Sequence, residues 1–285
     1  MRRLLLLFVM IGVAACGGRK IVKGTGDPLW GLRVRWHGHS CFSFEDSVGR
    51  TVLIDPFDET VGYVRPSAKP DAVLITHDHF DHADPRWTYV PRPSPLMGSR
   101  EKPDEDPVKM EKGKGRDRKQ VRMLPEGVFC STGTFAAADG IEVRSMRAFH
   151  DPVNGRRHGT TQMYVWSMGG LTLAHMGDIG QDRLTPEQIE FLKGADVLMI
   201  PVGGGPTIDA VRAAEFVRLI NPRIVIPMHY GNPLVRFAEL DSLESFLKQF
   251  ERIDPWTESQ RQIQADQVPA GPTVMVPALP SRRNH

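Results

Sequence analysis

Four candidate metal ligands lie within six positions of this chain, directly after a short apolar run. The run is Ala72-Val73-Leu74-Ile75, and the ligands His77, His79, Asp81 and His82 belong to the motif Thr-His-Asp-His-Phe-Asp-His that begins at Thr76. A run of this length bounded by polar residues predicts a buried strand, so the ligands lie in the loop that follows it. Side chains two apart in extended backbone point the same way. We expect His77 and His79 to bind one metal ion, and the next turn to bring Asp81 and His82 to a second.

The ligand types indicate which metals suit this loop. Neutral imidazoles favour zinc and similar transition metals, and a carboxylate suits a second ion that holds water. Two divalent ions, with zinc as the first choice and Mn²⁺ or Fe²⁺ as alternatives, are therefore the expected cofactors.

The overall composition indicates one catalytic domain. A chain of 285 residues with 40% hydrophobic content can bury one sizeable core. Its formal net charge of +2 is close to balance, so we expect no nucleic-acid partner. The oligomeric state is left open.

The first fifteen residues are typical of a secretion signal. Arg2 and Arg3 precede an apolar stretch, residues 4–15, that is too short to span a bilayer as a stable helix. The end of this stretch, Val13-Ala14-Ala15-Cys16, resembles the bacterial lipobox. We expect residues 1–15 to be removed and Cys16 to carry acyl chains, which would make the protein a lipoprotein of the cell envelope, on the periplasmic or cell-surface side.

Composition also suggests how the mature chain is divided. Residues 16–29 are glycine-rich and charged, which predicts a flexible tether. Residues 30–278 form the predicted domain, and 279–285 a tail. Within the domain, residues 91–120 are an insertion: three prolines precede a stretch, 100–120, in which 14 of 21 residues are charged. Such a segment cannot bury a core, so we interpret it as a surface loop. Whether Cys41 pairs with Cys130 is left open.

Alternating strands and helices are expected along the domain. The predicted strands are 32–36, 40–44, 51–55, 72–75, 127–130, 141–149, 162–168, 171–176, 197–202, 224–228 and 273–276. Helices are expected over 185–193, from a cap at Thr207 or Asp209 to Pro222, and over 242–250.

Three further candidate ligands follow predicted strands. His150 follows 141–149, Asp178 follows 171–176, and His229 follows 224–228. Strand ends are where α/β scaffolds present chemical groups on loops. We expect these three residues to complete the metal site.

Taken together, these motifs resemble the metallo-β-lactamase superfamily. The resemblance rests on Thr-His-Asp-His-Phe-Asp-His, Phe149-His150, His175-Met176-Gly177-Asp178 and Pro227-Met228-His229-Tyr230, supported by Gly38-His39-Ser40, Ile54-Asp55-Pro56 and Pro201-Val202-Gly203-Gly204. It covers about residues 31–277. Within the superfamily, the chain resembles the branch of metal-dependent hydrolases related to ascorbate-6-phosphate lactonase.

This resemblance implies a fold and a ligand set. The fold would be an α/β, four-layer αββα sandwich with a two-metal site at one edge of the sheets. By motif matching, His77, His79 and His150 would bind the first ion, Asp81, His82 and His229 the second, and Asp178 would bridge them. A shared carboxylate is chemically sensible because it offsets the repulsion of two nearby cations.

Differences between this chain and related families in their metal ligands restrict the reactions that we expect. True β-lactamases of this fold lack a bridging aspartate at the position of Asp178, and flavodiiron relatives carry glutamate where this chain has His79. We therefore expect a hydrolase in which a metal-bridging hydroxide attacks an ester, lactone, amide or phosphodiester of a small molecule or lipid. Asp81 is the candidate catalytic residue, orienting the hydroxide and taking its proton. A nuclease or nucleotide phosphodiesterase, and a metal-binding lipoprotein without turnover, stay open as alternatives.

Other polar residues are interpreted as supports. We expect His37, His39 and Asp55 to form hydrogen bonds beneath the site, and His175 to be structural. The segment Arg156-Arg157-His158 is interpreted as a solvated turn, with anion binding as the alternative. The run Gly203-Gly204-Gly205 is expected to form a tight turn before a helix.

Overall fold

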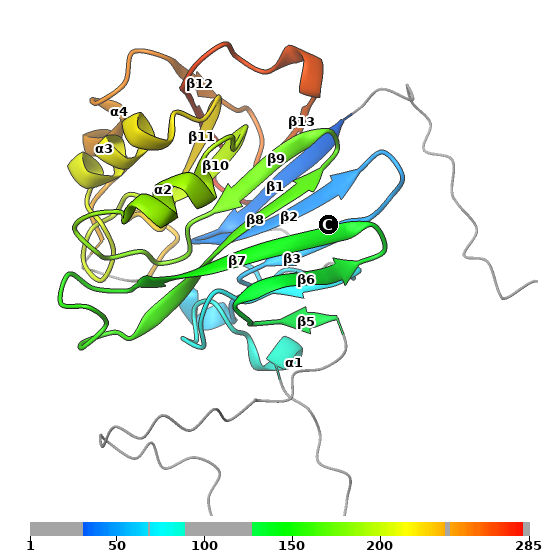
Figure 1. Cartoon of the computed structure of the whole chain (residues 1–285), viewed down its shortest axis with the longest axis horizontal. Coiled ribbons are helices and arrows are strands. Elements are labelled where there is room, and N and C mark those ends of the chain that lie inside the picture. The colour runs from blue at the N-terminus through cyan, green and yellow to red at the C-terminus, as the bar shows by residue number, and fades with distance from the viewer. Residues whose placement is uncertain (1–30, 68, 89–126, 237–239, 282–285) are drawn as a thin grey trace, which may run out of the picture.

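The computed structural model describes residues 31–67, 69–88, 127–236 and 240–281 (Figure 1). The predicted signal segment 1–15, Cys16, the tether 16–29, Trp30 and the insertion 91–120 lie outside the described residues, as do the last four residues of the predicted tail. Within the described part of the chain, none of the helices is long and apolar enough to cross a bilayer.

The chain opens with an antiparallel meander that begins a six-stranded sheet. The sheet order is β13-β1-β2-β3-β4-β5. Its strands are β1 (Leu32–Gly38), β2 (Cys41–Asp46), β3 (Thr51–Ile54), β4 (Ala72–Leu74), β5 (Val128–Phe129) and β13 (Gln260–Ile263). The strands from β3 to β5 pair in parallel, so β3 and β4 end at the same edge of the sheet.

A second sheet of eight strands lies against the first (Figure 1). Its order is β12-β14-β11-β10-β9-β8-β7-β6. Its strands are β6 (Gly133–Ala138), β7 (Ile141–Phe149), β8 (Thr160–Met168), β9 (Leu171–His175), β10 (Val197–Pro201), β11 (Ile224–Met228), β12 (Ile253–Pro255) and β14 (Thr273–Val276). Strands β6 to β9 pair antiparallel and β9 to β12 pair in parallel. As a result, β7, β9, β10 and β11 all end at one edge.

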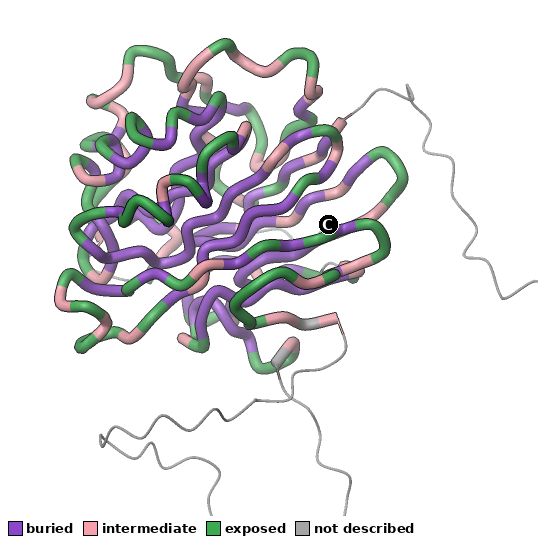
Figure 2. The backbone as a smooth tube through the Cα atoms, in the orientation of Figure 1, coloured by how far each residue is buried: buried purple, intermediate pink, exposed green. Residues whose placement is uncertain are grey.

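Apolar side chains from the inner faces of both sheets form the main core. Every second residue of β1 is buried, including Val34 and Trp36, as the strand period requires. The ring of Phe44 meets the ring of Trp166 edge-on at a centroid distance of 5.1 Å. Figure 2 shows the buried segments running through the middle of the stacked strands.

Helices cover the outer face of the eight-stranded sheet, where β10 and β11 are buried along their whole length. These helices are α2 (Pro186–Leu192), α3 (Ala210–Ile220) and α4 (Glu244–Leu247), which lie together in Figure 1. Thr185 and Gln188 form a capping box at α2, and the carboxylate of Asp209 accepts the N–H of Arg212 at α3.

The outer face of the six-stranded sheet is covered differently. Over the described residues its covering elements are short: the 3₁₀ helix η1 (Glu59–Val61), α1 (Pro85–Thr88) and the loops beside them. Phe57, Val61 and Tyr63 form a small apolar cluster there with Cys41 and Leu53. A second 3₁₀ helix, η2 (Ala265–Gln267), follows β13. The fold is an α/β sandwich, as expected, with its larger helices on one side.

The predicted strands agree with the structure in the centre of the sheets, but three strands at the sheet edges were not predicted. β7, β11 and β14 have the predicted bounds, and the helix capped at Asp209 ends before Pro222. β6, β12 and β13 were missed. The helix expected over 242–250 is regular only at Glu244–Leu247. Cys41 is buried and Cys130 is exposed, and these two described residues form no disulfide with each other.

Candidate metal centre

The loop after β4 turns sharply and brings its four candidate ligands together. The backbone N–H groups of His82 and Ala83 both donate to the carbonyl of His79, at 3.0 Å each. This turn returns the chain toward the sheet, so Asp81 and His82 lie beside His77 and not beyond it.

One group of ligands consists of three imidazoles. His77 Nε2 lies 2.9 Å from His79 Nδ1, and the ring of His150 lies 4.8 Å from the first ring and 5.1 Å from the second. His150 is held by its Nδ1–H, which donates to the carbonyl of Pro206 at 3.1 Å. Its Nε2 therefore faces the other two imidazoles with a lone pair. The candidate ligand atoms of these three residues lie within 4.8 Å of one another.

Asp178 lies between this group and a second one. Its Oδ2 is 3.0 Å from His82 Nε2, 3.1 Å from His229 Nε2, 3.4 Å from His150 Nε2 and 3.9 Å from His77 Nε2. Gly177 precedes it with φ of +54°, and a Cβ there would lie 2.3 Å from Thr161 Oγ1. Only glycine fits, and the N–H of Asp178 then donates to the same hydroxyl at 3.2 Å.

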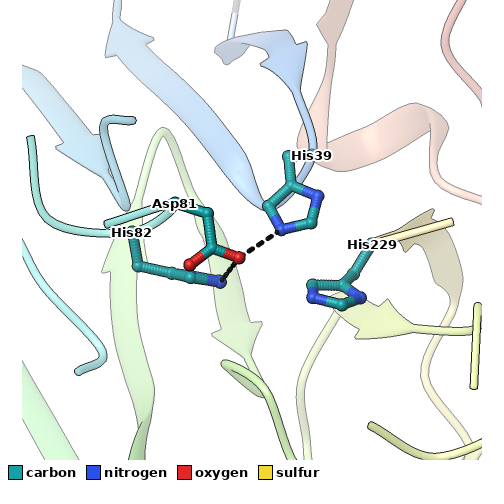
Figure 3. A group of neighbouring side chains, drawn as sticks. All are labelled: His39, Asp81, His82 and His229. Atoms are coloured by element: carbon teal, nitrogen blue, oxygen red, sulfur yellow. Dashed lines mark hydrogen bonds and ion pairs between the residues drawn. The ribbon is translucent and has the colours of Figure 1, made fainter. Parts of the chain in front are cut away.

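The second group contains His39, Asp81, His82 and His229 (Figure 3). Asp81 Oδ2 accepts from His39 Nε2 at 3.1 Å and lies 3.6 Å from His82 Nε2. The rings of His39 and His229 are 4.1 Å apart. His39 was expected to support the site from beneath, whereas its ring contacts two of the candidate ligands directly.

His37 and His39 point to different places although they are two residues apart. β1 ends at Gly38, where φ is +113°, and His39 follows in the left-handed region at +50°. This break in the strand turns His39 into the site. His37 instead contacts Ser43, with 2.8 Å between Nε2 and Oγ, and the expected hydrogen bonding beneath the site is wrong for it.

Asp55 supports the loop from behind, as expected. Its carboxylate accepts the N–H of Thr76 at 2.7 Å, the Thr76 hydroxyl at 2.8 Å and His82 Nδ1–H at 2.8 Å. This contact at Nδ1 orients the ring so that His82 Nε2 faces Asp178. Because the Thr76 hydroxyl donates to Asp55, it accepts from His77 Nδ1 at 3.0 Å, which leaves His77 Nε2 as an acceptor.

Backbone strain is concentrated at this centre. Within the described residues, five non-glycine residues have φ in the left-handed region, and three of them are His39, Asp55 and His229. Such backbone costs about 1–3 kcal/mol per residue and persists where the surroundings impose it. Gly203 contributes to this constraint, because a Cβ at that position would lie 2.3 Å from the carbonyl of His229.

The remaining supports agree with expectation. His175 is structural: its Nε2 donates to the carbonyl of Ser40 at 3.0 Å, and its Nδ1 accepts the N–H of Gly177. The run Gly203-Gly204-Gly205 forms a turn before α3, with the N–H of Thr207 donating to Gly204 O. The Pro206 carbonyl that orients His150 was not predicted, because the sequence does not reveal which backbone oxygen faces a side chain.

The protonation state of the first group of imidazoles, which is neutral, favours metal binding. Burial lowers the pKa of His77 well below its ordinary value and also lowers that of His150, so both imidazoles are neutral at neutral pH. Neutral imidazole is the form that binds a metal ion.

A cation suits the space between the two groups. Burial opposes charge on His82, yet Asp178, Asp81 and Asp55 raise its pKa well above the ordinary value. Burial would also raise the pKa of Asp178, but His229 and His82 hold it well below its usual range. Two buried atoms, His82 Nε2 and Asp178 Oδ1, have no hydrogen-bond partner. These donors fit divalent cations.

A compact turn at the rim follows His150. Asp151 Oδ1 accepts the N–H groups of Val153 and Gly155, and Oδ2 accepts those of Arg157 and His158, all at 2.8–2.9 Å. Arg157 and His158 are exposed, so the turn is solvated as expected. The ring of His158 is nevertheless 5.5 Å from that of His150.

Replacing Asp151 with asparagine should destabilise this turn in a pH-dependent way. Burial would raise the pKa of Asp151, but its four backbone hydrogen bonds lower it from 3.8 to about 2. They therefore stabilise the folded state fully above pH 3.8, and this stabilisation is lost as pH falls through about 2. We expect a loss of about 1–3 kcal/mol near neutrality. Urea unfolding in the presence of a chelator should show a wild-type advantage that shrinks below about pH 4. An advantage independent of pH would contradict this assignment.

Comparisons with known proteins agree with the fold and the site. The model of the beta-lactamase superfamily domain matches residues 33–229, a range that includes all seven predicted ligands. A UPF0173 metal-dependent hydrolase from Thermoplasma acidophilum is 33% identical over 206 residues, covering 70% of this chain and 84% of that protein. One from Pyrobaculum arsenaticum is 34% identical over 213 residues, covering 72% and 87%.

A solved structure extends the comparison to three dimensions. A protein from Thermotoga maritima, described as a candidate zinc-dependent hydrolase of the metallo-beta-lactamase superfamily, superimposes with a TM-score of 0.59 and 26% identity, covering 86% of this chain and 97% of that one. The chain therefore belongs to the beta-lactamase superfamily and, within it, to the UPF0173 metal-dependent hydrolases.

Proposed function

We propose that this metal-dependent hydrolase binds two divalent ions. In this proposal His77, His79 and His150 bind one ion, Asp81, His82 and His229 bind the other, and Asp178 bridges them. The observation that carries it is the position of Asp178 Oδ2, within 3.0–3.9 Å of imidazole nitrogens from both groups. The imidazole-rich donor set, and the description of the Thermotoga maritima relative, support zinc, with Mn²⁺ or Fe²⁺ as alternatives.

We assign different roles in the reaction to the metal ligands and to Asp81. Two bound ions would lower the pKa of a water molecule and polarise the oxygen of the bond under attack. Asp81 is proposed to orient this water and accept its proton. Burial disfavours the charged carboxylate, but His82 and His39 hold the pKa of Asp81 well below its usual range, so it is ionised and able to accept a hydrogen bond.

His39 is proposed as a positioning residue for Asp81. Burial, together with His229, lowers the pKa of His39 to about 4, so its ring is neutral and donates one N–H to Asp81 Oδ2. Replacing His39 with alanine should lower kcat by about 10- to 100-fold without removing metal. Glutamine, which keeps an N–H donor, should restore part of the loss. The matched control is His37→Gln, on the outer face of β1, the strand that precedes His39.

Two readouts distinguish positioning from a general loss of structure. The pH profile of kcat should change for His39→Ala, because Asp81 loses its donor, and should stay unchanged for His37→Gln. Equal loss of metal and activity in His39→Ala would show that His39 acts as a ligand and would refute the positioning role.

The substrate class is proposed from the chemistry of the site. Attack by activated water suits an ester, lactone, amide or phosphodiester of a small molecule or lipid. Phe80, which is 51% exposed between the ligands His79 and Asp81, offers an apolar surface for such a substrate. Similarity to the branch related to ascorbate-6-phosphate lactonase is part of this proposal and rests on the sequence motifs.

A substrate panel tests this function. The metal-loaded protein should cleave at least one reporter among aryl esters, lactones, amides and bis-phosphodiesters. A chelator should abolish turnover and added zinc should restore it. Preference for bis-phosphodiesters and nucleotides over esters would favour a phosphodiesterase. No turnover across the panel with full metal content would favour a metal-binding protein without catalysis.

The location of the protein in the cell envelope is a separate proposal. It rests on the apolar segment 4–15 and the cysteine that follows it, and it places the enzyme at a membrane through lipidated Cys16. In Cys16→Ser the protein should move from the membrane to the soluble fraction on cell fractionation. Unchanged membrane attachment of this variant would contradict lipidation.

A further inference from the structure

The outer face of the six-stranded sheet is divided into an apolar half and a polar half. Near β3 and β4 the outward side chains are apolar, and Phe57, Val61 and Tyr63 cover them. On β1 and β2 the outward positions are occupied by Arg33, Arg35, His37, Ser43 and Glu45, while the residues between them are buried in the core. The apolar face of an amphipathic helix would not pack against this polar half of the sheet.

A cavity of about 670 Å³ lies over the polar half. It is lined by residues of β1, β2 and β3, by residues 64–67, 69 and 70, and by residues 257–260 and 278–281. This volume is in the range of small-molecule sites. None of the seven candidate metal ligands lines it, so it is separate from the metal centre.

The charges around the cavity are predominantly positive. Four cationic side chains and two carboxylates line it, and one of those carboxylates, Glu45, is paired with Arg33 at 2.7 Å. Arg35 donates from Nε at 2.9 Å to the amide oxygen of Gln260, a neutral group, and within the described residues it has no carboxylate partner. Lys69 likewise has no carboxylate partner among the described residues. Their positive charges are therefore available to a ligand.

Arg65 adds a third cation with little compensation. Its Nε lies 3.5 Å from Asp84 Oδ2, but this carboxylate already accepts two closer contacts from Arg86, at 2.8 Å and 2.7 Å. Arg65 lines the cavity, and its buried Nε, beside Asp84, has no hydrogen-bond partner.

Neutral donors lie between these cations. His37 and Ser43 line the cavity, with His37 Nε2 and Ser43 Oγ 2.8 Å apart. Burial, together with Arg35, lowers the pKa of His37 to about 3, so the ring is neutral at physiological pH and keeps one N–H. The cavity lining thus combines guanidinium groups with an imidazole and a hydroxyl.

We propose that this cavity is a second binding site, for the phosphate group of a small molecule. A phosphate carries three acceptor oxygens and close to two negative charges, which matches several cations and neutral donors arranged around one space. Pro66, Pro70 and Leu279 in the lining would contact the organic part of the ligand. The same chemistry is offered by a soluble phosphate ester and by a phospholipid headgroup.

Nuclear magnetic resonance of the His37 ring tests the proposal at the cavity itself. Glycerol 3-phosphate added to the metal-loaded protein should shift the His37 signals saturably, and the double variant Arg35→Gln, Lys69→Gln should weaken binding by about 10-fold or more. The matched control is Arg218→Gln, an exposed arginine on α3 that does not line the cavity. If the double variant unfolds, Lys69→Gln alone, in an exposed loop, gives the same test.

The source of the phosphate is decided with vesicles. The Cys16→Ser chain is mixed with vesicles of phosphatidylcholine alone or with added phosphatidic acid, so that the predicted anchor cannot contribute. A His37 response or vesicle binding that requires phosphatidic acid and is weakened by Arg35→Gln, Lys69→Gln supports the site and identifies a headgroup. Absence of a response to both probes, or a response unchanged in the double variant, overturns the proposal.

Discussion

Replacing Asp178 with alanine is expected to lower hydrolysis by at least about 10³-fold, or about 4 kcal/mol of transition-state stabilisation. Asp178 Oδ2 is the atom shared by both ligand groups, and its removal leaves His82, His150 and His229 without their common anion. Turnover should be measured on whichever reporter the wild-type protein cleaves, together with bound metal. The matched control is Asp182→Ala, in an exposed position four residues later.

Two outcomes of this experiment are informative. Loss of metal and activity together is expected. Activity within a few-fold of wild type in a folded Asp178→Ala variant would show that the chemistry occurs elsewhere in the chain.

Replacing Asp55 with alanine is expected to have the largest effect on stability. Two donors of Thr76 and the Nδ1–H of His82 would lose their acceptor in a buried place, which costs about 3–5 kcal/mol. For a domain of this size the loss corresponds to a decrease in Tm of about 6–20 °C. Metal affinity should also fall by about 10- to 100-fold, because His82 is no longer oriented.

Asp71 provides a matched control for this prediction. Its Oδ2 accepts the N–H and the hydroxyl of Thr51 at 2.8 Å and 2.9 Å, the same two donor groups that Asp55 accepts from Thr76, but at the opposite end of β4 from the ligands. Asp71→Ala should lower Tm while keeping metal affinity at temperatures where it is folded. Equal loss of metal affinity in both variants would mean that Asp55 acts only through stability.

The fold was most predictable where strands are central. β7, β11 and β14 carry long apolar or alternating patterns because both neighbours and one or both faces are buried. The three missed strands, β6, β12 and β13, are all at the edges of their sheets. An edge strand has one neighbour and more solvent, so sequences such as Gln260-Arg261-Gln262-Ile263 lack the apolar signal on which prediction depends.

The candidate metal ligands could be predicted from the sequence more completely than the residues that orient them. Each of the seven predicted ligands follows a strand that ends at one edge, and these positions after predicted strands can be recognised in the sequence. The role of His39 could not be separated from that of His37, because the distinction depends on the left-handed backbone at Gly38 and His39. The contact between His150 and the Pro206 carbonyl depends on the packing of two distant loops, 56 residues apart.

Metal stoichiometry tests the central claim most directly. Purified protein should be saturated with zinc, dialysed and measured by elemental analysis beside the double variant His79→Ala, Asp178→Ala. Two ions per chain are predicted for the wild-type protein, and fewer than one for the variant. Wild-type protein that retains no divalent ion, or a double variant that retains the wild-type amount, would contradict the account.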